Sequence, residues 1–170
     1  MDKNSGYAQL ISCKYQNAFI TPLTGAWEFM NRPTILPWQK DWDKINKMSI
    51  RYNWSLNINL REILKKQNKA IVITNVNQVI EFASAEFETM TGYQVSEAIG
   101  RKPNFLQGKN TDPIVSKKIR ESLKASLPIS ETVLNYKKDG SIYYCKIDIH
   151  PVYDVNKILV NFIALETQLK

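Results

Sequence analysis

Histidine and cysteine, two residue types that often act in catalysis and metal binding, are scarce in this sequence, with one histidine and two cysteines. His150 is the single histidine, so imidazole acid–base catalysis or haem ligation would have to use it. It falls on the outward-facing parity of a predicted strand and precedes Pro151, as expected of an exposed strand end. Cys13 and Cys145 have no cysteine or histidine neighbours at metal-binding spacing, and they form no disulfide framework. We therefore predict neither an enzyme active site nor a metal centre.

A different chemistry is predicted where Asn135, Cys145 and Glu166 fall on strands of one sheet. Cys145 lies on the apolar parity of its strand, and Glu166 shares a strand face with Phe162 and Ala164. If the three polar side chains all face the concave side of the sheet, they form a polar cluster in an apolar cavity, the usual setting of a small-molecule site. A carboxylate there suits a ligand with an amine or amide donor, or it is protonated and donates a hydrogen bond itself. One alternative stays open, in which large side chains fill the cavity and Glu166 reaches water.

The composition is that of an ordinary globular chain. Its 170 residues, 44% hydrophobic and 23% charged, are enough for one compact domain with an appendage. No segment approaches the roughly 20 apolar residues that cross a bilayer, and the N-terminus lacks the apolar stretch of a secretory signal. We therefore expect no membrane contact and a cytoplasmic location.

The net charge of +7 raises the question of nucleic-acid binding. Residues 1–68 hold ten lysines and arginines against five aspartates and glutamates, and residues 69–170 hold thirteen against eleven. Even in the first part the two signs are interleaved, as in the segment 40–44. Binding to phosphates needs a coherent basic stripe that neutralises several of them together. We therefore predict no nucleic-acid partner.

Before the sheet, residues 1–68 are predicted to form an N-terminal arm and an amphipathic helical extension. The first 36 residues show no clear period and carry turn signals, so they indicate an irregular arm. Pro37 opens a predicted helix that runs to Asn53 and carries an apolar stripe beside a charged face. A second short helix is predicted at Leu60–Lys66, with Asn57 or Asn59 as its cap.

From residue 69 to residue 170 the pattern predicts a single α+β domain with an antiparallel sheet. A hairpin of two strands is followed by a short helix that Ser84 caps and Gly92 ends. Asp112 and Pro113 begin a longer helix, predicted to turn its apolar residues as far as Leu127 toward the core. The predicted strands are Ala70–Thr74, Val79–Ala83, Glu131–Lys137, Ile142–Ile149 and Lys157–Thr167.

Four segments of this domain resemble, in order and spacing, the motifs of the PAS superfamily. They are Glu81-Phe82-Ala83-Ser84 leading to Met90-Thr91-Gly92-Tyr93, the stretch from Gly100-Arg101 to Thr111-Asp112, Leu134-Asn135-Tyr136-Lys137-Lys138-Asp139-Gly140, and Pro151-Val152-Tyr153-Asp154. The resemblance covers about residues 69–168. It implies a PAS fold, which is a five-stranded antiparallel sheet with short helices and one long helix on one face, to which the N-terminal helical extension is added.

Within the superfamily, Phe105-Leu106-Gln107-Gly108 and the segment from Leu134 to Gly140 are most similar to the LOV branch, which holds a flavin for sensing blue light. The photochemistry of that branch uses the cysteine of an Asn-Cys-Arg triplet, because a thiol sulfur must add to the flavin ring. Here the triplet is Lys102-Pro103-Asn104. Proline has no thiol, so we expect no cysteinyl-flavin photochemistry at that position.

The resemblance also assigns the remaining residues of the candidate pocket. Gln107, Arg120 and Asn135 match flavin-contacting positions of the LOV branch. Three positions depart from its pattern, because Asn104 replaces an arginine, Cys145 an asparagine, and Glu166 the glutamine that faces the reactive edge of the ring. The candidate pocket thus consists of Asn135, Cys145, Glu166, Gln107 and Arg120. We predict no resident cofactor, with flavin held without adduct formation as the alternative.

The function predicted from these observations is that of a non-enzymatic sensory module in signal transduction. It acts by binding a small ligand or by docking on a signalling partner protein, and the resemblance implies a homodimer formed through the helix Pro37–Asn53 and the sheet. Two alternatives stay open. One is a redox or light sensor that binds flavin without an adduct, and the other is a ligand-free adaptor for protein interactions.

Overall fold

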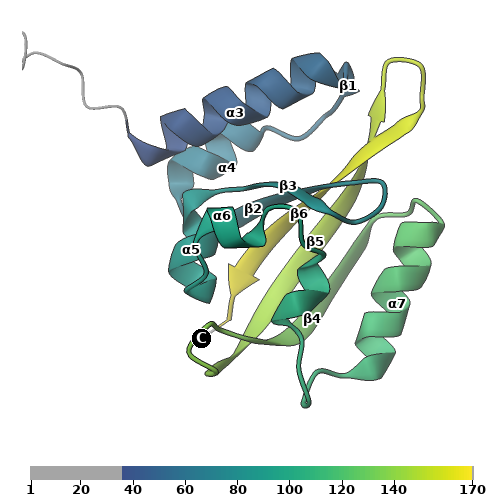
Figure 1. Ribbon diagram of the computed structural model, residues 1–170. Coiled ribbons are helices and arrows are strands. Elements are labelled where there is room, and N and C mark those ends of the chain that lie inside the picture. Colours follow the sequence, from purple (N-terminus) through teal and green to yellow (C-terminus); the bar gives the residue numbers. More distant parts are fainter. Residues whose placement is uncertain (1–35, 170) are drawn as a thin grey trace, which may run out of the picture. The chain divides into compact units, whose positions relative to one another are not determined.

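Antiparallel strands form one curved sheet in residues 36–169, the part of the chain that the computed structural model describes (Figure 1). Within that range the sheet has six strands in the order β1-β5-β6-β2-β3, and β4 pairs with β5. The strands are β1 Trp54–Ser55, β2 Ala70–Asn75, β3 Ile80–Ala83, β4 Ile129–Tyr136, β5 Ile142–Asp154 and β6 Leu159–Gln168. The two-residue β1, which pairs with the end of β5, is the one strand that the sequence did not predict. The predicted arm and Cys13 lie outside the described residues, apart from Leu36.

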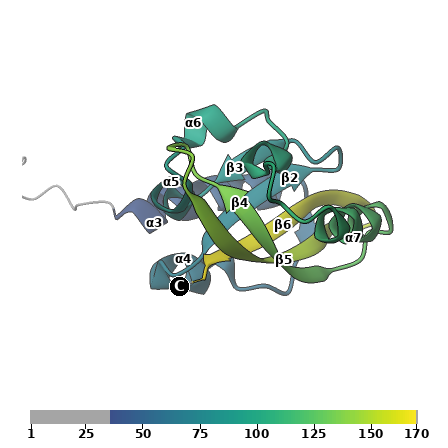
Figure 2. The same ribbon diagram turned by 90° about the horizontal axis from the view of Figure 1, so that it is seen from below.

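Helices cover both faces of this sheet (Figures 1 and 2). They are α3 Pro37–Arg51, α4 Leu60–Lys66, α5 Ala85–Thr91, α6 Val95–Ala98 and α7 Pro113–Lys124, together with the 3₁₀ helix η1 Pro103–Leu106. α5, α6, η1 and α7 lie on one face, and α3 and α4 lie on the other. The predicted α+β fold is confirmed, with its short helices and one longer helix on one face and the helical extension added to it.

The inner strand β2, between β6 and β3, is buried on both sides, because each of its faces supplies a different hydrophobic core. Ala70 and Val72 pack in the core beneath α5, α6 and η1. Ile71 and Ile73 pack in the core beneath α3 and α4. The period of two along a strand thus distributes one short apolar run between two layers of helices.

The predicted capping residues Asn59 and Asp112 accept hydrogen bonds at the starts of their helices, whereas Ser84 bonds to another partner. Asn59 accepts a hydrogen bond from the Glu62 amide at 3.2 Å, and Asp112 accepts one from the Ile114 amide at 2.8 Å. Ser84, predicted to cap α5, stands at the capping position, but its hydroxyl accepts from the Ile71 amide of β2 at 3.0 Å. Asp41 of α3 instead accepts a hydrogen bond from the backbone at the start of α5.

That contact fixes α3 to the opposite layer of the fold. A carboxylate oxygen of the buried Asp41 accepts from the Ala85 amide, the first residue of α5, at 2.8 Å. Burial raises the pKa of Asp41, and the amide hydrogen bond and Lys44 oppose that rise. On the same side of α3, Ile45 is buried and Trp42 packs against the core. The apolar stripe predicted for this helix therefore packs within the chain itself.

The prediction that Leu127 faces the core at the end of α7 is wrong. The helix ends at Lys124, and Ser126 takes a left-handed backbone conformation with φ 54°. This reversal turns the chain away from the helix axis, so Leu127 is 57% exposed rather than inward. None of the helices in the described range is long and apolar enough to cross a membrane.

A buried amide joins the segment after α3 to the sheet. Asn161 of β6 is fully buried, and its Nδ2 donates to the Thr74 carbonyl and to a carboxylate oxygen of Glu81, both at 3.1 Å. Its Oδ1 accepts from the indole N–H of Trp54 at 3.0 Å, and the Tyr52 hydroxyl donates to Glu81 at 3.0 Å. One amide thus satisfies polar groups from three strands and sets the position of β1.

Asn161→Ala is expected to lower the free energy of unfolding by about 2–4 kcal/mol, because it leaves several buried polar groups without partners at once. Urea denaturation followed by circular dichroism measures the loss. Asn110→Ala is the matched control, since the Asn110 side chain is exposed and makes no hydrogen bond within residues 36–169. An Asn161→Ala protein as stable as the control would contradict this account of the network.

Candidate functional site

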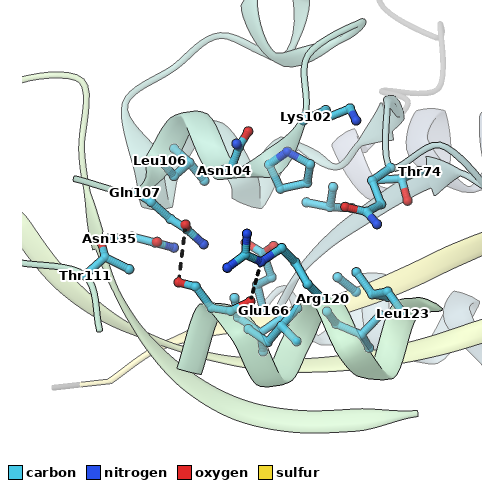
Figure 3. Close-up of a pocket in the computed structure, with 18 of the residues that line it drawn as sticks. Thr74, Lys102, Asn104, Leu106, Gln107, Thr111, Arg120, Leu123, Asn135 and Glu166 are labelled. Carbon is cyan, nitrogen blue, oxygen red and sulfur yellow. Dashed lines mark hydrogen bonds between the residues drawn. The ribbon is translucent and has the colours of Figure 1, made fainter. Parts of the chain in front are cut away.

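A cavity of about 500 Å³ lies between η1, α7 and the face of the sheet that also carries α5 and α6 (Figure 3). Its wall is largely apolar and includes Val72, Leu106, Ile119, Leu123, Ile147, Ile149, Phe162 and Ala164. The polar residues differ in burial, because Asn135 and Glu166 are buried whereas Lys102, Asn104 and Arg120 are exposed. The volume and the mixture of an apolar wall with a few polar groups are typical of small-molecule sites.

Four of the five predicted pocket residues line this cavity. Asn135 comes from β4, Glu166 from β6, Gln107 from the segment after η1, and Arg120 from α7. The structure thus brings together side chains from four separate parts of the chain. That they bind a ligand stays a prediction.

The structure does not place Cys145 in the cavity wall. Cys145 is fully buried in the core cluster with Phe87 and Met90, beneath α5. It shares a strand face with Ile147 and Ile149, and those two β5 residues do line the cavity. Strand parity alone therefore assigned the correct face but did not resolve the position along it.

Sequence reasoning missed other wall residues that the same rules could have found. Thr74 is two residues beyond Val72, so the period of β2 places both on one face. Ser116 lies three residues before Ile119 on α7, which puts them on one side of the helix. Thr111 belongs to a loop, for which no period exists.

Gln107 is positioned from two sides. The Ser116 hydroxyl donates to the side-chain oxygen Oε1 of Gln107 at 3.4 Å. The Arg120 Nε donates in turn to the Ser116 backbone carbonyl at 3.3 Å (Figure 3). After Gln107, the chain crosses the ring of Tyr136 so closely that any Cβ on Gly108 would overlap the ring. A larger residue at position 108 would therefore require the Tyr136 ring to move.

The loop that follows is fastened to β4 by hydrogen bonds. The Thr111 hydroxyl donates to the Leu134 carbonyl at 2.7 Å and accepts from the Gly108 amide at 3.0 Å. The Asn110 amide donates to the Tyr136 hydroxyl at 3.0 Å. These contacts hold this side of the cavity against the sheet.

Glu166 is the least satisfied group of the site. It is 4% exposed, and its Oε2 has no hydrogen-bond partner among residues 36–169. Burial away from water raises the pKa of its carboxyl to about 7. A carboxyl group therefore lies in a largely apolar wall, and no residue of the described part of the chain forms an ion pair with it.

The pKa values of two residues near Glu166, Tyr143 and Cys145 of β5, are also raised. Burial, with the Glu166 charge as a further cause, raises the pKa of both Tyr143 and Cys145. Within residues 36–169 the Tyr143 hydroxyl has no hydrogen-bond partner, although the Asn135 side-chain amide lies near it. Both groups stay neutral at physiological pH, so neither offsets the Glu166 charge.

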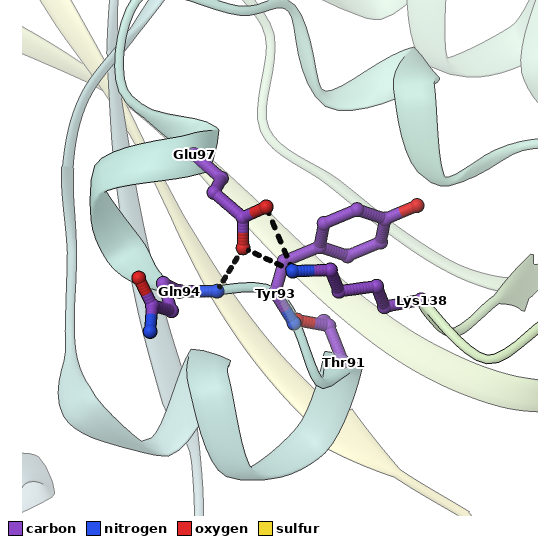
Figure 4. A network of polar contacts seen from close by, with 5 residues as sticks. All are labelled: Thr91, Tyr93, Gln94, Glu97 and Lys138. Carbon is purple, nitrogen blue, oxygen red and sulfur yellow. Dashed lines mark hydrogen bonds and ion pairs between the residues drawn. The ribbon is translucent and has the colours of Figure 1, made fainter.

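A separate polar network closes the end of the sheet near the β4–β5 hairpin (Figure 4). Lys138 Nζ donates to both carboxylate oxygens of Glu97 at 2.8 Å, and Glu97 also accepts from the Gln94 amide at 2.9 Å. The hydrogen bond from Lys138 is the main cause that lowers the pKa of Glu97. The Lys138 amide donates to the Thr91 carbonyl at 2.9 Å. This network joins α5 and α6 to the hairpin and contributes no residue to the cavity.

The expectation that His150 is an exposed strand end is wrong, because β5 continues to Asp154 and His150, opposite Ile163 of β6, is half-buried. That position does not bring it to the cavity wall. Among the described residues, no group of histidine, cysteine, aspartate and glutamate side chains has the arrangement of a metal site.

Comparison with known proteins gives consistent matches to the region that forms this sheet and cavity. The model of the PAS domain family matches residues 68–167. Phototropin-1A of Oryza sativa subsp. japonica is 38% identical over 113 residues, which are 65% of this chain and 12% of that protein. A blue-light-activated histidine kinase of Brucella canis is 38% identical over 85 residues, which are 50% of this chain and 17% of the kinase. The chain thus spans less than a fifth of the length of these relatives.

Solved structures match over a larger share of their own length. A structure from a flavin-analogue study of the light-oxygen-voltage domain mechanism matches with a TM-score of 0.62 and 32% identity, covering 67% of this chain and 87% of that one. The LOV domain of the Erythrobacter litoralis EL346 blue-light activated histidine kinase matches with a TM-score of 0.57 and 26% identity, covering 59% and 95%. In the second case the matched part is the LOV domain itself.

The unpaired Glu166 carboxyl predicts an unusual pH dependence of stability. Its pKa is about 7 in the fold against 4.5 in the unfolded chain, so between these values the folded state binds a proton that the unfolded state does not. The stability that the neutral carboxyl allows is fully present below about pH 4.5 and is lost as the pH rises through about 7.

Glu166→Gln keeps the size of the side chain but does not ionise. We expect the variant to exceed the wild type in free energy of unfolding by about 1–3 kcal/mol at pH 8 and to match it near pH 4.5. Urea denaturation at the two pH values measures the difference. Glu121→Gln, at an exposed position of α7, is the control and should show no such dependence. An equal effect of both substitutions at pH 8 would refute the assignment.

Proposed function

The chain belongs to the PAS domain family, and from that premise we propose that it is a sensory module which a small non-flavin ligand occupies and which signals through a partner protein. Its homologues include blue-light photoreceptors and blue-light-activated histidine kinases. The observation that carries the proposal is the cavity of about 500 Å³, with an apolar wall and the buried polar side chains Asn135 and Glu166. Such a cavity suits a ligand that leaves water almost completely.

The wall of the cavity supports a mechanism without a covalent flavin adduct. Pro103 and Asn104 line it, and no cysteine of the described chain does so. Cys145 lies in the neighbouring core, where burial raises the pKa of its thiol. A neutral, buried thiol is a poor nucleophile.

Flavin bound without an adduct is the second candidate, and one observation favours it. Gln107, Arg120 and Asn135, which match flavin-contacting positions of the LOV branch, all line the cavity. The fit is nevertheless incomplete. Asn104 supplies no guanidinium for a phosphate, and the carboxyl of Glu166 would be buried without a partner if it faced another acceptor. We therefore assign no step to a flavin.

The output is proposed to be a change in protein contacts and not a catalytic step. The matched part of the Erythrobacter litoralis kinase is its LOV domain, and a photosensor domain of this kind signals without catalysis of its own. A homodimer through α3 remains a proposal. The apolar stripe of α3 packs on the sheet of the same chain, so such a dimer would use the outer face of the helix, where Lys44, Lys47 and Ile50 are exposed.

An absorption spectrum and a native mass spectrum of the gently purified protein test the proposal together. We expect a colourless sample whose native mass exceeds that of the chain, or of two chains, by a small molecule that denaturation releases. Yellow flavin absorption would favour the second candidate instead. A mass with no excess would favour the ligand-free adaptor.

A matched variant separates the adaptor from the ligand sensor. Asn135→Leu with Glu166→Leu removes the buried polar groups of the cavity and keeps its apolar wall. A ligand sensor should lose the bound mass in this variant, whereas an adaptor should keep its partner binding unchanged.

A further inference from the structure

Glu166 lies in the cavity as a carboxyl with no positive partner. No salt bridge within residues 36–169 includes it, and its Oε2 has no hydrogen-bond partner. Its residue is 4% exposed, so water from outside reaches it poorly. A buried carboxylate is costly unless a cation or several hydrogen-bond donors stabilise it.

The other groups near Glu166 do not provide that charge. Tyr143 and Cys145 of β5 feel its charge but are neutral. Asn135 of β4, which is 3% exposed, offers an amide and no charge. A second hollow of about 490 Å³, which Glu166 also borders, is lined by the acidic Glu86 of α5 and by Lys69, whose ammonium already pairs with Asp148 at 3.7 Å.

The two cations of the cavity lie at its exposed part. Arg120 of α7 is exposed, and its Nε is engaged by the Ser116 carbonyl at 3.3 Å. Lys102 is exposed as well. Neither forms an ion pair with Glu166. The buried part of the cavity is therefore acidic, while its opening is basic.

We propose that this cavity selects a ligand with a cationic nitrogen head group, an amidinium or an ammonium on an apolar body, whose N–H groups donate to the Glu166 carboxylate. The inference rests on the proposed ligand-binding function and adds the charge class of the ligand. The side-chain oxygen of Asn135 is a second acceptor on the same face of the sheet (Figure 3). Val72, Leu106 and Phe162 provide the contact surface for the apolar body.

Such a ligand resolves the electrostatic problem of the site. Charge-assisted hydrogen bonds from nitrogen to a carboxylate are about twice as strong as neutral ones. A ligand with an acceptor at this position would instead require Glu166 to remain protonated. Selectivity for a cation over a neutral molecule of the same shape is therefore the property that distinguishes the proposal.

Benzamidine, benzamide and benzoate are suitable probes, because they share one shape and carry a positive charge, no charge and a negative charge. Binding to the whole chain is followed at pH 8.5 through the backbone amide NMR signals of Val72, Leu106 and Ala164, which line the cavity. We expect benzamidine to bind at least about tenfold more tightly than benzamide and benzoate not to bind.

The wild type alone provides a second measurement. Between pH 5.5 and pH 8.5 the ionised fraction of an acid with a pKa of about 7 rises about thirtyfold. The affinity for benzamidine, which stays charged over this range, should rise by about the same factor, while that for benzamide should not. Glu166→Gln should abolish both the preference for benzamidine and the pH dependence of its affinity. Glu121→Gln, at an exposed position of α7, should preserve them.

The outcomes separate this inference from the function on which it rests. Equal binding of benzamidine and benzamide at the cavity signals would overturn the cationic selectivity, for example because water satisfies Glu166, and would leave a ligand-binding cavity. If no probe perturbs those signals, both the selectivity and the ligand-binding function are overturned.

Discussion

The fold depends on a sheet that must be covered on both faces. Each residue of β2 and β6 points alternately to one core or the other, so neighbouring residues serve different layers. In β6, Ile163 and Leu165 pack beneath α3 and α4, whereas Phe162 and Ala164 line the cavity. A one-residue slip of β6 would place Glu166 among apolar side chains on the other face and empty the cavity wall. The same alternation that builds the core therefore also fixes the chemistry of the cavity.

Much of this arrangement could be predicted from the sequence. Strand parity placed Glu166 with Phe162 and Ala164, and capping chemistry located the start of α7 at Asp112 and Pro113. These predictions succeed because they use local rules, namely the period of a strand and the unsatisfied amides of a helix end. The ordered motifs added the topology, which no local rule provides.

Three of the failures share a physical cause, since each depends on contacts between residues distant in sequence. Cys145 lies on the correct face, but the position of α5 decides that it packs with Phe87 and not in the cavity wall. Ser84 was available as a cap, yet the Ile71 amide of β2 takes its hydroxyl. β1 exists because Trp54 reaches the buried Asn161, which is over a hundred residues away. Only the folded chain brings such partners together.

The location of the aromatic side chains has a spectroscopic consequence. Trp38, Trp42 and Trp54 pack on the α3 and α4 side of the sheet, and no tryptophan of the described residues lines the cavity. Thr74 nevertheless joins the two sides, because it lines the cavity and its carbonyl accepts from the same Asn161 amide that holds the indole of Trp54. A change in the fluorescence emission of these three indoles on filling the cavity would thus report a movement of the sheet and not direct contact with the ligand.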